Sequence, residues 1–216
     1  NWFMGGQGAD TIDGAGGSDR VNYSQGSAPW ELPQTQGIVL DLAAGTAIDN
    51  YGDTDVLISI EDVIGSTLDD SIKGDDQRNV VDGLDGNDTI YGYGGDDDLR
   101  GGEGNDVLYA GDGNDWLYTG NGDDLLFGEA GDDTLVLDGT GASTLDGGEG
   151  RDTLRVSFYN TLNPNYENTI IVDLASGIMG QTGNLSDPRT DTLISIENVD
   201  FTSDVGLRLT GTEEDN

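Results

Sequence analysis

The sequence predicts an all-β fold in which short parallel strands stack into an elongated solenoid. Three observations support this prediction. A nine-residue phrase repeats eight times without a slip from Gly65 to Val136. The eighth place of every copy holds one aliphatic residue, and the first six places are rich in Gly, Asn and Asp. No segment has a convincing helical period, so strands are the only regular structure that we expect.

Each repeat is expected to supply one turn and one short strand. Its first six residues suit a turn with positive φ angles, because Gly, Asn and Asp tolerate them. Its last three residues suit a strand whose middle side chain points inward. Two repeats then make one coil, and stacked coils form two parallel sheets around a shared core. The predicted core residues are Ile72, Val81, Ile90, Leu99, Leu108, Leu117, Leu126 and Leu135.

The remaining segments arrange similar elements around this tract, and we expect one elongated domain over residues 1–216. The segments TIIVDLASGIM and RTDTLISIENVDF match the earlier GIVLDLAAGTA and DTDVLISIEDVIG, so the chain contains two copies of one plan. The expected divisions are residues 1–22 (two repeats), 23–64 (an interruption with two strands), 65–136 (the tract), 137–155 (a degenerate copy and one repeat) and 156–216 (a second interruption and a truncated repeat).

The chain is strongly acidic. Eight Lys and Arg residues stand against 43 Asp and Glu residues, which gives a net charge of −35, and there is no His. Nucleic acid and anionic membranes need a basic face, so neither is an expected partner. Like charges repel one another and oppose a compact state unless cations neutralise them. The composition alone therefore favours disorder, whereas the aliphatic period predicts an ordered fold with an external stabiliser.

Several classes of protein and site are excluded. The chain has no Cys, which rules out disulfides and thiolate metal sites. Its first residues do not resemble a signal peptide, and no apolar run approaches the ~20 residues of a membrane span, so we expect no membrane insertion. Because it begins at Asn1 without Met and stops within a repeat, we interpret it as a piece of a longer protein.

The repeated Asp at the sixth place predicts a metal site in every pair of stacked turns. Burial of one aliphatic side chain per repeat does not offset the entropy lost by ordering so many glycines. The Asp carboxylates and the turn carbonyls are hard oxygen ligands of the kind that calcium takes, six to eight at a time. Magnesium fits less well, because it prefers a small octahedral shell that keeps water. The sequence therefore predicts several bound Ca²⁺ ions.

Turns on one side of the solenoid come from alternate repeats, which predicts the neighbours. Each ion would lie between stacked turns and share an Asp from each, together with turn carbonyls. Asp133, near the end of the tract, would then belong to one site only. The expected neighbours are Asp88, Asp106 and Asp124 on one side, and Asp97, Asp115 and Asp133 on the other.

Some repeats depart from the pattern. The Asp70–Asp88 site is expected to be weaker because Leu68 replaces the fourth-place Gly, and the Asn79–Asp97 site is doubtful because Asn79 has no charge. Ala110 and Thr119, which replace Gly at the first place of their repeats, are milder departures. The residues expected to bind calcium, by carboxylate or carbonyl, are Asp10, Asp19, Asp70, Gly83, Asp85, Gly86, Asp88, Gly92, Gly94, Gly95, Asp97, Gly101, Glu103, Gly104, Asp106, Ala110, Asp112, Gly113, Asp115, Thr119, Asn121, Gly122, Asp124, Gly128, Ala130, Gly131, Asp133 and Asp152.

The repeat resembles G-G-x-G-x-D-x-U-x, the calcium-binding nonapeptide of the RTX (repeats-in-toxin) family. The resemblance covers the nonapeptides, and more weakly the two interruptions. It implies a right-handed parallel β-roll with calcium in its turns. It also implies a structural module of a larger protein that is exported by a type I system and folds on binding calcium outside the cell or at its surface.

The outward strand positions leave other functions open. One sheet would carry an aromatic stripe of Tyr91, Tyr109 and Phe127. We favour packing that stiffens the sheet, and the alternative is an adhesin-type module that binds a glycan or protein through this stripe or through loops. A third interpretation is an accessory domain of an enzyme whose active site lies elsewhere. The chain itself is not expected to be an enzyme, because no nucleophile stands beside a base.

Overall fold

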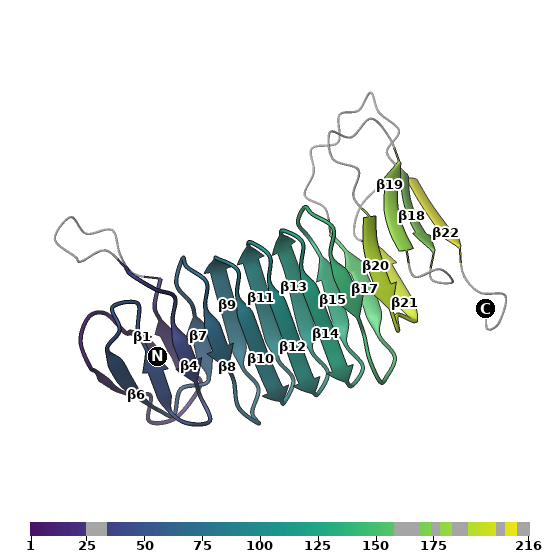
Figure 1. The fold of residues 1–216 in the computed structure, drawn as a ribbon. Coiled ribbons are helices and arrows are strands. Elements are labelled where there is room, and N and C mark those ends of the chain that lie inside the picture. Colours follow the sequence, from purple (N-terminus) through teal and green to yellow (C-terminus); the bar gives the residue numbers. More distant parts are fainter. Residues whose placement is uncertain (25–33, 158–168, 174–177, 183–189, 202–205, 211–216) are drawn as a thin grey trace.

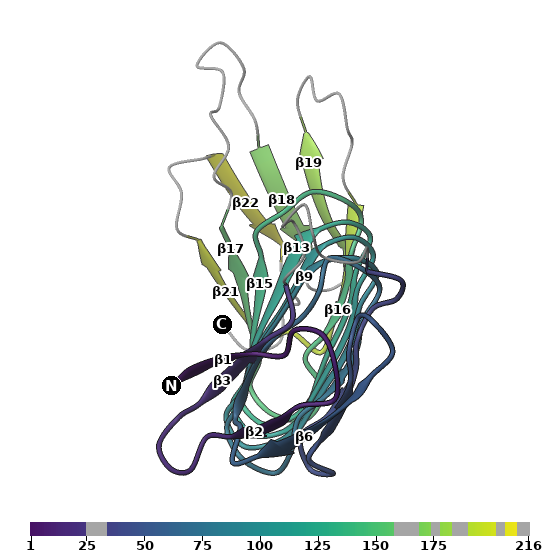
Figure 2. The same ribbon diagram turned by 90° about the vertical axis from the view of Figure 1, so that its left-hand side faces the viewer.

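The computed structural model describes residues 1–24, 34–157, 169–173, 178–182, 190–201 and 206–210. These residues form 22 strands and no helix, arranged as two sheets that face each other in an elongated roll (Figures 1 and 2). No helix in these ranges is therefore long and apolar enough to cross a membrane. The predicted truncated repeat, residues 211–216, lies outside the described residues.

The nine-stranded sheet is parallel throughout. Its strands, in spatial order, are β1 (Trp2–Met4), β3 (Arg20–Asn22), β7 (Asp62–Ile64), β9 (Val80–Asp85), β11 (Asp98–Glu103), β13 (Trp116–Asn121), β15 (Thr134–Leu137), β17 (Thr153–Val156) and β21 (Asn198–Phe201).

The thirteen-stranded sheet is parallel except for one antiparallel stretch of three strands in each interruption. Its strands, in spatial order, are β2 (Thr11–Asp13), β6 (Thr54–Ile58), β5 (Thr46–Ile48), β4 (Val39–Asp41), β8 (Ser71–Lys73), β10 (Thr89–Gly94), β12 (Val107–Asp112), β14 (Leu125–Ala130), β16 (Thr144–Asp146), β20 (Thr190–Ile194), β19 (Ile178–Thr182), β18 (Thr169–Asp173) and β22 (Gly206–Thr210).

The parallel β-roll and its register are confirmed. Strands two repeats apart pair in register, so that Ile90 lies opposite Leu108 and Leu99 opposite Leu117. All eight predicted core residues are fully buried, at 0% exposure. Alternation of inward and outward side chains places one aliphatic residue per repeat between the two sheets.

The strands of the tract are longer than the three residues predicted for each repeat. From β9 to β14 each has six residues, because pairing continues into the first places of the next turn. Tyr93 thus lies opposite Gly111, and Gly94 opposite Asp112. The turns are therefore more regular than the glycine content suggested, since much of their backbone is hydrogen-bonded to the next coil.

The first interruption contains more strands than the two predicted. GIVLDLAAGTA forms the antiparallel pair β4 and β5, and β5 also pairs with β6. DTDVLISIEDVIG, which we expected as one β-rich run, divides into β6 in one sheet and β7 in the other. A turn of three residues, 59–61, joins them. The second interruption repeats this arrangement with β18, β19, β20 and β21.

The fourth-place glycines are required for both conformation and space. Gly113 has φ +150°, and a Cβ there would lie 1.9 Å from the carbonyl oxygen of Gly95 in the adjacent coil. Gly104, Gly122 and Gly131 face the preceding coil in the same way. A side chain at any of these four glycines would push two coils apart.

We therefore expect Gly113→Ala to lower the free energy of unfolding of the calcium-loaded protein by at least ~1–2 kcal/mol, from backbone strain and the steric clash. Chemical denaturation followed by circular dichroism measures this change. Gly16→Ala is the matched control, because a Cβ at Gly16 meets nothing within 4 Å. Equal stability changes in the two variants would contradict the steric explanation.

Candidate metal-binding turns

The sixth-place carboxylates form two ladders, one along each turn edge of the roll. In each ladder an Oδ1 atom accepts a hydrogen bond from the backbone N–H of the sixth-place residue one coil earlier. The Asp88 N–H donates to Asp106 at 2.8 Å, and the Asp106 N–H donates to Asp124 at 3.0 Å. On the other edge the Asp97 N–H donates to Asp115 at 2.7 Å, and the Asp115 N–H to Asp133 at 2.9 Å. The structure thus places the predicted neighbours side by side.

The second carboxylate oxygen of most ladder residues is buried without a hydrogen-bond partner. The ladder residues with such an Oδ2 atom inside the tract are Asp88, Asp97, Asp106, Asp115 and Asp133, and each is at most 2% exposed. A buried carboxylate oxygen without a donor is costly. A bound cation is the group that would satisfy it.

The first-place glycines show where such a cation would lie. A Cβ on Gly83 would lie 2.2 Å from the Asp88 Oδ2 atom and 2.7 Å from the carbonyl oxygen of Gly101 in the next coil. Gly92 faces Asp97 and the carbonyl of Ala110 in the same way, at 2.2 and 2.5 Å. Oxygens from two stacked turns therefore converge on one small space, which only a residue without a Cβ leaves open.

Burial raises the pKa of these carboxyl groups well above the usual value. The pKa rises to about 8 in Asp88, to about 7 in Asp97 and Asp133, and to about 6 in Asp106 and Asp115. Loss of water around the charged form is the largest cause, and neighbouring carboxylates raise the pKa further. A divalent cation would favour the charged form and oppose both effects.

Each space is bordered by one carboxylate oxygen and one backbone carbonyl, and the carboxylate of the next coil accepts a hydrogen bond from the N–H of the first Asp. No group of three or more Asp, Glu, His or Cys side chains gathers around one point within the described residues. Two carboxylates balance the charge of one divalent ion. The donor set, carboxylate and carbonyl oxygen without nitrogen or sulfur, is the set that calcium prefers.

Asp70 differs from the other ladder residues because protein groups use both of its oxygens. Its Oδ1 atom accepts from the Ile38 N–H at 2.7 Å and the Ser66 hydroxyl at 2.6 Å, and its Oδ2 atom accepts from the Ser66 N–H at 2.6 Å. We predicted a weak site here from Leu68. The structure gives Ser66 as a further reason, because its hydroxyl and amide compete with a cation for Asp70.

Asn79 also uses its side chain within the protein. Its Oδ1 atom accepts from the Asp75 N–H, and its Nδ2 atom donates to the carbonyl of Glu61, both at 2.9 Å. The amide oxygen therefore faces the space beside Gly74, where a Cβ would lie 2.2 Å from it, and the amide nitrogen donates toward the preceding coil, where a carboxylate would accept. The site predicted as doubtful thus has an uncharged oxygen that already accepts one hydrogen bond.

At the N-terminal end an aromatic residue fills the space next to the turn. The exposed Asp10 has its N–H bonded to Asp55 at 2.9 Å, and the other Asp55 oxygen accepts from the Tyr23 hydroxyl at 2.8 Å. A Cβ on Gly5 would collide with the Tyr23 ring. Asp10 therefore does not face a free carboxylate oxygen. Asp55 and Tyr23 occupy this turn instead, and the repeat pattern did not indicate either residue.

The degenerate copy changes the C-terminal ends of both ladders. It is one residue longer, so Leu126 pairs with Leu145 across 19 positions. Ser143 stands in place of Asp and exchanges hydrogen bonds with Asp124 at 3.3 Å. On the other edge the Asp133 N–H donates to Asp152 at 2.9 Å. The expectation that Asp133 has one neighbouring Asp is wrong, because it lies between Asp115 and Asp152.

The fifth-place side chains face solvent and form a separate outer ladder. The Asn105 N–H donates to the Asn87 Oδ1 atom at 2.9 Å, and the Asp123 N–H donates to Asn105 at 2.8 Å. In adjacent pairs such as Asp96 and Asp97, the first side chain is exposed and the second is buried. The two carboxylates therefore do not face each other as an acid and base would.

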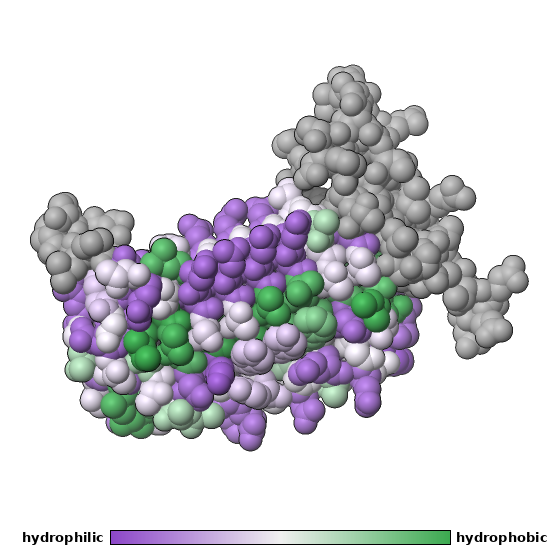
Figure 3. All heavy atoms as spheres, viewed as in Figure 1, coloured by the Kyte–Doolittle hydropathy of each residue, from purple (hydrophilic) through white to green (hydrophobic). Residues whose placement is uncertain are grey.

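The outer faces of the sheets carry stacked aromatic rings. The ring centroids of Tyr91 and Tyr109 lie 5.0 Å apart, and those of Tyr109 and Phe127 lie 4.9 Å apart, with nearly parallel planes. The three rings are only partly exposed. Figure 3 shows a band of apolar residues along one side of the roll, bordered by hydrophilic turns. The stacking of Tyr91, Tyr109 and Phe127 on one another matches the packing role that we favoured.

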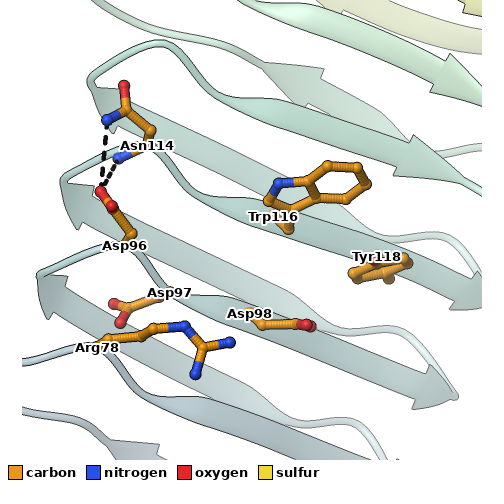
Figure 4. Close-up of a pocket in the computed structure, with 7 residues that line it drawn as sticks. All are labelled: Arg78, Asp96, Asp97, Asp98, Asn114, Trp116 and Tyr118. Carbon is orange, nitrogen blue, oxygen red and sulfur yellow. Dashed lines mark hydrogen bonds between the residues drawn. The ribbon is translucent and has the colours of Figure 1, made fainter.

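A shallow depression lies over the nine-stranded sheet (Figure 4). It has a volume of about 430 Å³ and contains Arg78, the run Asp96 to Asp98, Asn114, Trp116 and Tyr118. Asn114 donates to Asp96 from its backbone N–H at 2.9 Å. The exposed Trp116 ring and the carboxylate of Asp98 give this depression an aromatic surface beside hydrogen-bond acceptors.

The fold and the turns together define an acidic, oxygen-lined β-roll built to hold divalent cations. A family model, the RTX calcium-binding nonapeptide repeat (4 copies), matches residues 1–27, 64–99, 73–108, 100–135 and 136–156, more than half of the chain. The chain belongs to this family of calcium-binding repeats. A search of curated proteins found no match. The buried oxygens and the glycine spaces described above fit the calcium that the family implies.

The position of Asp133 between two carboxylates predicts its effect on ion binding. Asp133→Asn should remove or weaken two sites, as should Asp106→Asn, because each residue contributes an oxygen to the spaces on both of its sides. Asn keeps an acceptor for the neighbouring N–H, but it removes the charge and replaces the second oxygen with an N–H donor. Counting bound ions by native mass spectrometry tests this. Asp76→Asn, at an exposed carboxyl group, is the control, and a loss of one ion in Asp133→Asn against two in Asp106→Asn would contradict the pairing.

The raised pKa values predict opposite effects of pH on the metal-free and calcium-bound protein. Folded-state values above the usual 3.8 mean that protonation stabilises the metal-free fold below about pH 4, and that this stabilisation is lost as the pH rises through 6 to 8. Calcium competes with these protons, so its half-saturating concentration should fall over the same pH range.

Urea denaturation of metal-free protein, and calcium titrations at several pH values, measure the two trends. Asp88→Asn serves as the matched variant, since it removes the group with the highest of these pKa values and should flatten the profile above pH 7. Metal-free stability that rises between pH 5 and 8 would show that the buried carboxyl groups are not the titrating groups.

Proposed function

We propose that this calcium-binding structural module folds on binding several calcium ions after a type I system exports the protein that contains it. The observation that carries the proposal is the set of buried, unpartnered Oδ2 atoms in the ladders. Each is held beside the carboxylate of the next coil, in a chain of net charge −35. Without cations these carboxylates must be desolvated and must repel one another, both of which oppose folding.

The residues that would hold the ions follow from the ladders. Each ion would take a carboxylate from two successive coils and carbonyl oxygens from their turns. Calcium bound there supplies the positive charge that the oxygens lack, so its binding free energy becomes folding free energy. The pairs best suited to this are Asp88–Asp106, Asp97–Asp115, Asp106–Asp124, Asp115–Asp133 and Asp133–Asp152.

The dependence on calcium would restrict the folded roll to the outside of the cell. Extracellular calcium modules typically bind at about 10⁻⁴–10⁻³ M. At such affinities the turns stay empty at cytosolic calcium concentrations and fill after export. The module would then give rigidity to the exported protein, at the cell surface or beyond it, and would take no part in catalysis.

Calcium titration of metal-free protein, followed by circular dichroism, tests the proposal. We expect a cooperative gain of β-sheet signal between about 10⁻⁴ and 10⁻³ M calcium. Magnesium at equal concentration is the control, and it should produce much less signal because it keeps its water shell. A β-sheet signal that is complete in the presence of chelator and unchanged by calcium would contradict coupled folding.

The depression near Trp116 supports a second candidate, an adhesin-type module that binds a glycan. Aromatic rings beside acceptors suit a sugar, whose C–H face stacks on the ring while its hydroxyl groups donate. Trp116 is 37% exposed, and its ring also lies 5.6 Å from the Arg155 guanidinium. A glycan array with calcium-loaded protein tests this candidate. If glycan binding survives in Trp116→Ala, or if no glycan binds, the site at Trp116 is contradicted and only the structural role is supported.

A further inference from the structure

A three-residue turn, Ser-Ile-Glu, occurs once in each interruption. Residues 59–61 join β6 to β7, and residues 195–197 join β20 to β21. Each turn crosses from one sheet to the other, but only six positions separate the core residues on its two sides, Leu57 from Val63 and Leu193 from Val199, against nine positions in the repeats. Both turns lie outside the segments that match the family model. The interruptions therefore contain a turn type of their own within the same roll.

Glu197 occupies the place of a sixth-place Asp in the ladder. The Asp152 N–H donates to the Glu197 Oε2 atom at 2.7 Å, just as the Asp133 N–H donates to Asp152 at 2.9 Å. The Asn198 N–H then bonds to the Asp152 carbonyl at 2.9 Å, as the next residue does in the repeats. The additional methylene of Glu compensates for the shorter turn.

Ser195 supplies the carbonyl that a first-place glycine supplies elsewhere. A Cβ on Gly147 would lie 2.3 Å from the Ser195 carbonyl oxygen and 2.4 Å from the Asp152 Oδ2 atom. The corresponding distances at Gly128 are 2.4 Å to the carbonyl of Gly147 and 2.4 Å to Asp133 Oδ2. The same two kinds of oxygen thus converge on the same kind of space.

The Asp152 side chain indicates that this space holds a cation. It is 0% exposed, and its Oδ2 atom has no hydrogen-bond partner. An unpartnered oxygen, a carbonyl and a second carboxylate are the donor set found in the tract.

The first interruption repeats this geometry. The Asp19 N–H donates to the Glu61 Oε2 atom at 2.9 Å, and a Cβ on Gly14 would lie 2.1 Å from the Ser59 carbonyl oxygen. Asp19 is 1% exposed, and its Oδ2 atom has no partner. Its Oδ1 atom accepts a hydrogen bond from the Asn1 side-chain amide at 2.6 Å.

We propose that both Ser-Ile-Glu turns complete further calcium sites, one made by Asp152, the Ser195 carbonyl and Glu197, and one made by Asp19, the Ser59 carbonyl and Glu61. The identity of the ion rests on the proposed function of the roll. On the other side of Glu61 the Asn79 amide donates to the Glu61 carbonyl at 2.9 Å, so the first short turn contributes to one proposed site only.

Native mass spectrometry of the full chain at saturating calcium tests the proposal. Glu197→Gln keeps an acceptor for the Asp152 N–H and removes the charge, and we expect it to lose one bound ion. Glu61→Gln should lose one ion or require at least tenfold more calcium to fill it. Glu129→Gln, at an exposed Glu side chain in the tract, is the control and should keep the full count.

The outcomes separate the two proposals. An unchanged ion count and calcium affinity in both Glu197→Gln and Glu61→Gln would overturn the inference while leaving the roll a calcium module. A wild-type chain that binds no calcium would instead overturn the proposed function. If a variant loses β-sheet signal, its lower ion count can result from unfolding. Anomalous scattering from calcium-loaded wild-type crystals then tests the site directly. Density bonded to Asp152 Oδ2 and the Ser195 carbonyl supports the site, and its absence there overturns it.

Discussion

The sixth-place carboxylate links each coil of the roll to the next, and the rest of the structure depends on this link. One oxygen accepts a hydrogen bond from a backbone N–H of the preceding coil, as Asp106 does from the Asp88 N–H at 2.8 Å. The other oxygen is buried without a donor. The hydrogen bond fixes the spacing of the turns, and the remaining oxygen leaves a buried charge. A roll built this way is regular because of its carboxylates, and their buried charge is the charge that a bound cation would balance.

The glycines make this link possible by leaving room at two places of each turn. The first-place glycine leaves the space on which carboxylate and carbonyl oxygens converge, and the fourth-place glycine lets coils approach at positive φ, as Gly83 and Gly113 show. The entropy lost in ordering these residues is the cost of that close approach. The turns thus bring the coils together at an entropy cost that bound cations would offset.

The periodic features could be predicted from the sequence, because a nine-residue period determines which residues share a face and which turns are stacked. Local exceptions could not. Asp133 meets Asp152 because Leu145 enters the core opposite Leu126, and the turn absorbs one additional residue. Tyr23 fills the space beside Gly5, and the Asn79 amide reaches Glu61. Each of these contacts joins segments that no repeat relates, so they depend on tertiary packing.

The interruptions modify the roll without ending it. The nine-stranded sheet passes from β3 through β7 to β9 with parallel pairing, while the thirteen-stranded sheet takes in a β-hairpin at each interruption. Four additional strands at about 4.8 Å each make one sheet longer than its partner, so the sheets must spread apart. In Figure 1, β18, β19 and β22 diverge from β21. The short Ser-Ile-Glu turn is what keeps the two sheets joined at such a point, because three residues can cross only where the sheets remain close. A carboxylate from that turn then continues the ladder on which the neighbouring coils depend.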